Sequence, residues 1–220
     1  GDFFRKDWMV GYLPNELPKD LMVYIASDHA VSADQDRDAT VLLPVGVDSN
    51  DDIWILPEIW WRRAETDDVV EAMIDLIDRY KPLMWWAERG HISKSIGPFL
   101  RKRMQERGIY AAIDEVTPAK DKQTRAQAIR GRMAMGKVKF PRFAPWYQDA
   151  EQELLKFPSA KHDDFVDALA YIGLGLSKQF GARVPVLSEP KGFPVGSMGW
   201  LKQASNDQRR REKQLRLGGF

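Results

Sequence analysis

Four carboxylates occupy positions from which an α/β protein could use them together. Asp28 and Glu88 each follow directly on an apolar run of strand length. Asp164 and Asp167 lie three residues apart, so on a helix they would share one face near its first turn. Acids at the carboxyl ends of adjacent parallel strands converge on the crevice where such proteins bind ligands. The spacing therefore predicts one acidic site built from two strand ends and a helix.

Each of these acids also has an ordinary explanation. An acid after a buried strand often marks only where solvent begins, and acids such as Asp163 and Asp164 commonly cap a helix N-terminus. That explanation suits Asp167 poorly, because it lies within the apolar stretch Phe165-Val-Asp-Ala-Leu169 with no base nearby in the sequence. A carboxylate beside a packed face needs compensation, and a metal ion can supply it.

The ligands available in the sequence restrict which metal and which chemistry are possible. The chain has no Cys and three His, which excludes thiolate sites and disfavours zinc. Oxygen ligands suit Mg²⁺ or Mn²⁺, and two such ions about 4 Å apart can hold the attacking and leaving oxygens of a phosphodiester. A glycosidase needs only two acids, so the others would have no role. The cluster therefore favours metal binding and phosphoryl chemistry over acid–base catalysis alone.

A basic stretch follows between residues 119 and 142, where Asp121 is the only acid. Such a surface is either an ordinary solvated helix face or a surface for the phosphates of a DNA duplex. No base-reading motif is visible, so sequence-specific recognition is not predicted. The residues predicted to bind DNA are Lys122, Arg125, Arg130, Arg132 and Lys137.

Composition is that of an ordinary globular protein, with 33 basic and 32 acidic residues and a net charge of +1. The near-neutral total hides a basic tail over residues 181–220, so it does not argue against a polyanionic partner. Apolar runs are too short to span a bilayer, so no membrane partner is expected. The lack of Cys fits a reducing cytosol.

The elements that must position the acids can be predicted from periodicity and turn signals. The order is three strands, helix, strand, helix, strand and then helices, which predicts an α/β fold whose mixed five-stranded sheet joins an antiparallel meander to parallel strands. The expected strands cover residues 21–27, 40–47, 53–60, 82–87 and 109–116. The expected helices cover residues 66–81, 93–107, 122–135, 146–156 and 163–177, with a short extended piece at 138–140.

Three regions follow from this order. Residues 1–20 show no clean periodicity and are predicted to be an irregular lead-in, the remnant of a linker. Residues 21–180 form the predicted domain. Residues 181–220 are Pro- and Gly-rich and then basic, so they are predicted to be a peripheral tail. That tail either binds DNA or a partner, or is an inert solubilising end.

The order of the motifs resembles the nuclease domain of the large terminase subunit of tailed phages, a member of the ribonuclease H-like superfamily. The similarity rests on the strand ending in Asp28, on Glu88-Arg-Gly-His91, on the segment over residues 122–138 and on His162-Asp-Asp-x-x-Asp-Ala168. It extends over roughly residues 20–178. No Gly-x-x-x-x-Gly-Lys-Ser/Thr phosphate loop occurs, so the sequence resembles the nuclease half of that family.

The resemblance implies a metal-dependent endonuclease that hydrolyses double-stranded DNA and cuts concatemeric phage DNA during genome packaging. It implies that Asp28, Glu88 and Asp164 are the core ligands of two Mg²⁺ or Mn²⁺ ions, and that Asp167 or Asp163 completes the set. The portal and the small terminase subunit would be partners, in the host cytoplasm.

Two other functions remain open on the sequence alone. A Holliday-junction resolvase would carry a similar Asp-x-x-Asp on its last helix, and a non-catalytic docking module would carry structural acids. The roles of two further residues are also open. Asp38 is either a loop acid or an outer residue of the metal site. His162 either contacts a phosphate or leaving group, or only lies beside a helix cap.

Overall fold

The structure is a computed structural model that describes residues 2–30, 39–90, 92, 96–117, 121–160 and 162–181. Residues 1–180 form one compact unit, and residues 181–220 form a second. Apart from Gly181 at the end of a helix, the predicted basic tail lies outside the described residues.

An eight-stranded mixed sheet forms the centre of the first unit, in the order β1-β8-β4-β3-β2-β6-β7, with β5 also paired to β3. The pairs β2·β3, β3·β4 and β3·β5 are antiparallel, whereas β2·β6, β6·β7, β1·β8 and β4·β8 are parallel. This arrangement confirms the predicted α/β class, with its antiparallel meander and parallel strands. The strands are β1 (Val10–Tyr12), β2 (Met22–Asp28), β3 (Thr40–Val47), β4 (Ile53–Ile55), β5 (Trp60–Arg62), β6 (Met84–Glu88), β7 (Ile113–Val116) and β8 (Val138–Pro141).

Three of these strands were not expected as separate members of the sheet. The expected strand over residues 53–60 is divided into β4 and β5, with Pro57 between them. Proline has no backbone N–H to donate to a neighbouring strand, which is consistent with the interruption between β4 and β5. The short extended piece expected at residues 138–140 is β8, which pairs with both β4 and β1.

The segment over residues 1–20 is a correction to the sequence prediction. It contains β1 and two short 3₁₀ helices, η1 (Lys6–Trp8) and η2 (Pro14–Glu16). Phe4 and Met9 are fully buried against the core, so the segment is part of the fold rather than an irregular lead-in. A three-residue strand is too short to show a period, which is why the pattern missed it.

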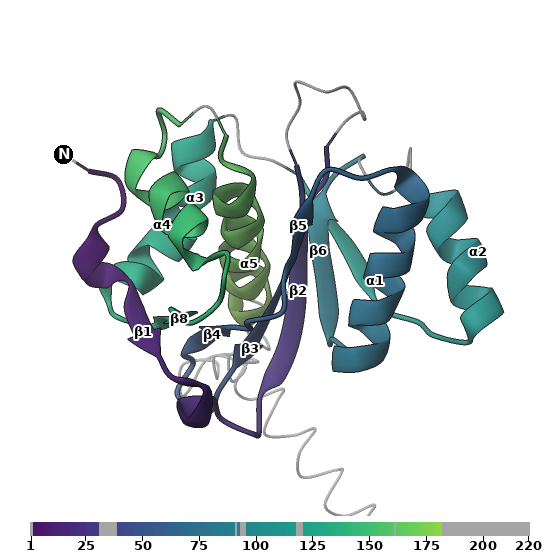
Figure 1. Ribbon diagram of the computed structural model, residues 1–220, viewed down its shortest axis with the longest axis horizontal. Helices are drawn as coiled ribbons and strands as arrows, with labels where there is room; N and C mark the ends of the chain where they lie inside the picture. Colours follow the sequence, from purple (N-terminus) through teal and green to yellow (C-terminus); the bar gives the residue numbers. More distant parts are fainter. Residues whose placement is uncertain are drawn as a thin grey trace, which may run out of the picture. The chain divides into compact units, whose positions relative to one another are not determined.

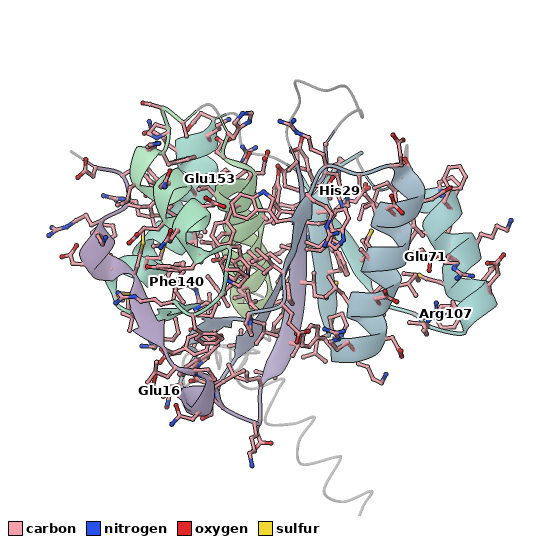
Figure 2. All side chains as sticks on the ribbon, in the orientation of Figure 1. Glu16, His29, Glu71, Arg107, Phe140 and Glu153 are labelled. Atoms are coloured by element: carbon pink, nitrogen blue, oxygen red, sulfur yellow. The ribbon has the colours of Figure 1, made fainter. Side chains whose placement is uncertain are left out.

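Helices cover both faces of the sheet (Figure 1). Helices α1 (Thr66–Tyr80) and α2 (Gly97–Arg107) pack on one face, over a core that includes Ile25 and Trp85. Helices α3 (Lys122–Ala134), α4 (Tyr147–Lys156) and α5 (Asp164–Gly181) cover the other face. Figure 2 shows Glu71 and Arg107 in the first of these helical layers, and Phe140 and Glu153 on the side of the second. Among the described residues, no helix is long and apolar enough to cross a membrane.

Helix α5 approaches its neighbours at two glycines. A Cβ built on Gly175 would overlap the indole ring of Trp86 on β6, and one on Gly173 would lie 2.8 Å from the backbone nitrogen of Ile129 on α3. The side-chain hydrogen of glycine is therefore what allows α5 to lie directly against β6 and α3. The same helix carries Asp164 and Asp167, so this packing sets how close they come to the ends of the strands.

We expect Gly175→Ala to destabilise the protein by about 1 to 3 kcal/mol, because the added methyl group overpacks the contact with Trp86. The matched control is Gly131→Ala on α3, where nothing lies within 4 Å of a built Cβ. That change should be neutral or stabilise by up to about 1 kcal/mol, since alanine favours a helix. Urea unfolding of both variants measures the difference. Equal stability of the two variants would contradict this account of the packing.

Candidate metal centre

Asp28 and Glu88 lie at the ends of neighbouring parallel strands. The β2·β6 register pairs Ser27 with Ala87, one residue before each acid. Side chains alternate between the faces of a sheet, so Asp28 shares a face with Ala26, and Glu88 shares the same face with Trp86. Ala26 and Trp86 belong to the core under α3, α4 and α5. Both acids therefore face the layer that contains α5.

Helix α5 brings the other two predicted acids to the same place. Asp164 and Asp167 are 4% and 9% exposed, which is unusual burial for carboxylates. Asp164 Oδ2 accepts the backbone N–H of Ala39, just before β3, at 3.0 Å. The pKa of Asp28 is raised well above its ordinary value, first by burial and then by the negative charges of Asp167, Asp164 and Glu88. Four acids that are distant in the sequence thus act on one another.

Two bases of α3 reach into this acidic cluster. Arg125 Nη2 donates to Asp167 Oδ1 at 2.8 Å, and Lys122 Nζ lies 2.6 Å from Asp163 Oδ2. Asp167 therefore has a basic partner, which comes from 42 residues earlier in the chain. Burial outweighs the attraction of Arg125, and the pKa of Asp167 is raised to about 6.

Tyr171 is a member of the site that sequence reasoning missed. Its hydroxyl donates to Glu88 Oε2 at 2.6 Å, and its ring is fully buried. Asp164, Asp167 and Tyr171 recur at i, i+3 and i+7, which places them on one face of α5. That spacing could have indicated that Tyr171 lies beside the acids. Nothing in the sequence shows that this face of the helix contacts Glu88.

Glu153 of α4 is a second missed residue. Its Oε2 accepts the backbone N–H of Phe165 at 2.9 Å, in the first turn of α5. Burial is the largest cause that raises the pKa of Glu153 to about 7, and the charges of Asp164 and Asp163 add to it. A carboxylate from another helix thus holds the end of α5 that carries the acids, and no local pattern could have indicated it.

The donor set fits a hard divalent cation in its chemistry. The buried groups are carboxylates whose mutual repulsion a cation would relieve. As arranged, however, no three His, Asp or Glu side chains within the described ranges are close enough to hold one ion. The acids thus lie around a common space, with Asp163 and Asp167 each held by a base.

The five residues predicted to bind DNA do not form one surface. Lys122 and Arg125 lie at the acidic cluster, and Arg125 is only 8% exposed. Arg132 and Lys137 form ion pairs with Asp51 and Asp52, in the turn after the far end of β3. Arg130 donates to the backbone oxygen of Phe3. Folding thus gives all five an intramolecular partner, and DNA binding by them stays a prediction.

Two further predictions concern Asp38 and His162. Asp38 lies outside the described residues. His162 and Glu153 line a small cleft of about 260 Å³, and a contact of His162 with a phosphate stays a prediction.

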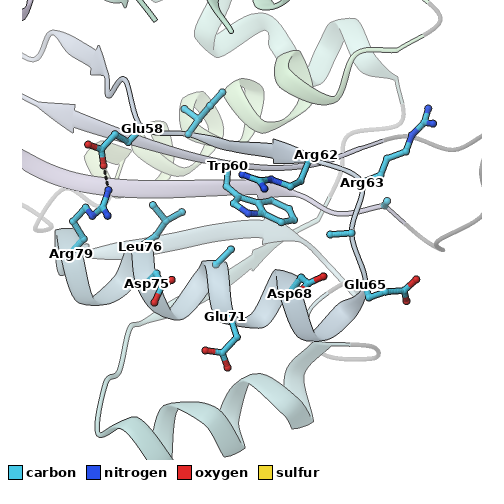
Figure 3. A pocket seen from close by; sticks show the side chains of 14 residues that line it. Glu58, Trp60, Arg62, Arg63, Glu65, Asp68, Glu71, Asp75, Leu76 and Arg79 are labelled. Atoms are coloured by element: carbon cyan, nitrogen blue, oxygen red, sulfur yellow. Dashed lines mark ion pairs between the residues drawn. The ribbon is translucent and has the colours of Figure 1, made fainter. Parts of the chain in front are cut away.

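A larger cleft, of about 770 Å³, lies between α1 and the segment around β5 (Figure 3). It is on the α1 side of the sheet, whereas the acidic cluster faces α5. Two of its acids are paired, Glu58 with Arg79 and Glu71 with Arg103. Arg62 lies over the ring of Trp60 at 5.2 Å. This cleft is therefore separate from the candidate metal centre.

Comparison with solved structures supports the fold. The magnesium-bound nuclease of the large terminase from thermophilic phage G20c is 18% identical and matches with a TM-score of 0.53, over 76% of this chain and 93% of that one. The human cytomegalovirus terminase nuclease domain, soaked with manganese, is 11% identical with a TM-score of 0.51, over 80% of this chain and 94% of that one. The large terminase of another thermophilic bacteriophage is 10% identical with a TM-score of 0.56, over 80% of this chain and 45% of that one.

No match is found among curated proteins. The model of the terminase RNase H-like domain matches residues 25–174, which include every acid of the cluster. This match covers well over half of the sequence, and the chain belongs to the family of terminase RNase H-like domains.

Proposed function

We propose that this chain is a divalent-metal-dependent endonuclease that hydrolyses the phosphodiester bonds of double-stranded DNA. The observation that carries the proposal is the convergence of Asp28, Glu88, Asp164 and Asp167 at one end of the sheet. There, burial and then the charges of the other three acids raise the pKa of Asp28. Similar folds belong to terminase nucleases whose structures hold magnesium or were soaked with manganese. A cluster of oxygen donors with no thiolate suits those ions.

Asp28, Glu88 and Asp164 would hold two Mg²⁺ or Mn²⁺ ions in the proposed site, and Asp167 would complete or orient the set. When bound, such ions lower the pKa of water and stabilise the charge on the leaving oxygen. The Tyr171 hydroxyl donates to Oε2 of Glu88 and helps to orient this carboxylate. The Ala39 N–H donates to Oδ2 of Asp164 and helps to orient this carboxylate.

Lys122 is the residue of the predicted basic set best placed to meet a phosphate. Its side chain is 50% exposed, and it lies at the cluster through its ion pair with Asp163. Family membership further suggests that the activity cuts concatemeric phage DNA during packaging in the host cytoplasm, with the portal and the small terminase subunit as partners. The chain aligns with only 45% of the longer large terminase among the similar structures, so the activities of the rest of that protein are not assigned to it.

We expect Asp28→Asn and Asp164→Asn each to reduce nicking of a supercoiled plasmid by at least about a hundredfold, because each change removes a metal ligand. Both variants should stay folded, and their metal-free forms should be as stable as the wild type or more stable, since repulsion is relieved. Plasmid cleavage with Mg²⁺, Mn²⁺, Ca²⁺ or a chelator, together with thermal unfolding, measures both effects.

The control is Asp75→Asn, an exposed acid of α1 on the other face of the sheet. It should cleave like the wild type. Retained cleavage in both site variants would contradict the proposal and favour a docking module. Preference for a four-way junction over the plasmid would instead favour a resolvase.

The raised pKa of Glu153 predicts how stability depends on pH. This carboxyl has a pKa of about 7 in the folded protein and 4.5 ordinarily. Between these values the folded state binds a proton that the unfolded state has lost, so stability falls as the pH rises. In chelator, the melting temperature of the wild type should therefore fall between about pH 5 and pH 8.

Glu153→Gln should flatten this fall, because glutamine keeps an acceptor for the Phe165 N–H and does not ionise. The same substitution at the exposed Glu106 of α2 controls for the loss of one negative charge. Melting curves of the three proteins across the pH range check the expectation. An unchanged pH dependence in Glu153→Gln would show that burial does not raise this pKa.

A further inference from the structure

Arg125 is the most deeply buried Arg or Lys among the described residues. It is 8% exposed, and its guanidinium lies 5.7 Å from the centre of the Tyr171 ring. One nitrogen, Nη2, donates to Asp167 at 2.8 Å. Its Nε is also buried, and it has no partner in the part of the chain that the structure describes. Burying a guanidinium with an unused donor is costly unless its charge is needed there.

The surrounding charges show why a positive charge is needed. Asp28, Glu88 and Asp164 face the same space as Asp167. Burial and then the charges of Asp167, Asp164 and Glu88 raise the pKa of Asp28, and the charge of Arg125 lowers it. The charges of Asp167 and Glu88 in turn raise the pKa of Arg125. Its position is thus that of a cation surrounded by carboxylates.

A second ion pair on α3 shows what an ordinary structural pair looks like. Arg132 lies 3.1 Å from Asp51, whose side chain is 46% exposed, at the opposite end of the sheet. In the Arg125–Asp167 pair both side chains are almost inaccessible, at 9% and 13%. Water can screen the first pair but not the second, so only the second acts strongly on nearby charges.

We propose that Arg125 is an internal counter-ion of the carboxylate cluster. Arg125 pairs with Asp167 in the metal-free protein, and its positive charge opposes the binding of divalent cations. The inference rests on the proposed metal site and refines it. Asp167 then positions Arg125, and the ligands are Asp28, Glu88 and Asp164. The cluster can fold without metal because one buried base offsets part of its charge, and metal binding is weakened by that same base.

The test measures Mn²⁺ binding by calorimetry and melting in chelator, on the full chain. Arg125→Met keeps much of the side-chain volume and removes the charge. It should melt at a lower temperature without metal, because Asp167 loses its partner, and it should bind Mn²⁺ about tenfold more tightly or better, because a nearby like charge is gone. Arg125→Lys should stay close to the wild type in both measurements. Arg132→Met is the matched control, and it should leave the Mn²⁺ dissociation constant unchanged.

The double variant Arg125→Met/Asp167→Asn keeps the test decisive if Arg125→Met does not fold. It removes one positive and one negative charge, so its Mn²⁺ dissociation constant should stay within about threefold of the wild type. Weaker Mn²⁺ binding in the double variant would mean that Asp167 is itself a ligand and would overturn the proposal. Unchanged or weaker Mn²⁺ binding in a folded Arg125→Met variant would also overturn the proposal. Arg125 would then have a structural role only.

Plasmid nicking by the wild type separates this inference from the proposed function. If the variants bind Mn²⁺ as expected but the wild type does not cut DNA, the proposed nuclease activity is wrong and the counter-ion role of Arg125 is still supported. If the wild type cuts DNA but Arg125→Met gains no affinity for Mn²⁺, only the counter-ion role of Arg125 is wrong.

Discussion

The mutual repulsion of buried carboxylates is the constraint on which the organisation of this site depends. Asp164 and Asp167 are nearly inaccessible to water, and their charges and that of Glu88 all act on Asp28, so each negative charge penalises the others. Such a cluster can form only if protons, internal bases or bound cations offset part of its charge. The buried Arg125, which donates to Asp167, is such an internal base, and the raised pKa values of Asp28 and Asp167 favour the binding of protons there.

The fold meets this constraint through the packing of α5. Gly173 and Gly175 let the helix lie against Ile129 of α3 and Trp86 of β6. That contact brings Tyr171 within hydrogen-bonding distance of Glu88, and it places Asp167 beside the base that α3 supplies. The strands contribute acids at their ends, and the helical layer determines how near those acids come to one another and what neutralises them.

Sequence reasoning located the acids because local patterns encode them. Apolar runs of strand length predict where β2 and β6 end, and i, i+3 spacing places Asp164 and Asp167 on one helical face. It could not find the Arg125–Asp167 pair or the Glu153–Phe165 contact, which join separate helices and depend on how these pack. Sequence reasoning also predicted one DNA-binding surface from five bases that are close in the sequence. In the structure the length of α3 separates Arg132 from Lys122.

The α5 acids make contacts with other elements that the ordinary explanation, helix capping, does not include. The N–H of Phe165, in the first turn, is received by Glu153 from α4. Asp163 instead holds Lys122, Asp164 accepts the N–H of Ala39 before β3, and Asp167 holds Arg125. Glu153 thus supplies part of the capping of α5 from another helix. Their burial toward Asp28 and Glu88 is a cost to folding, and the proposed cation site would offset that cost.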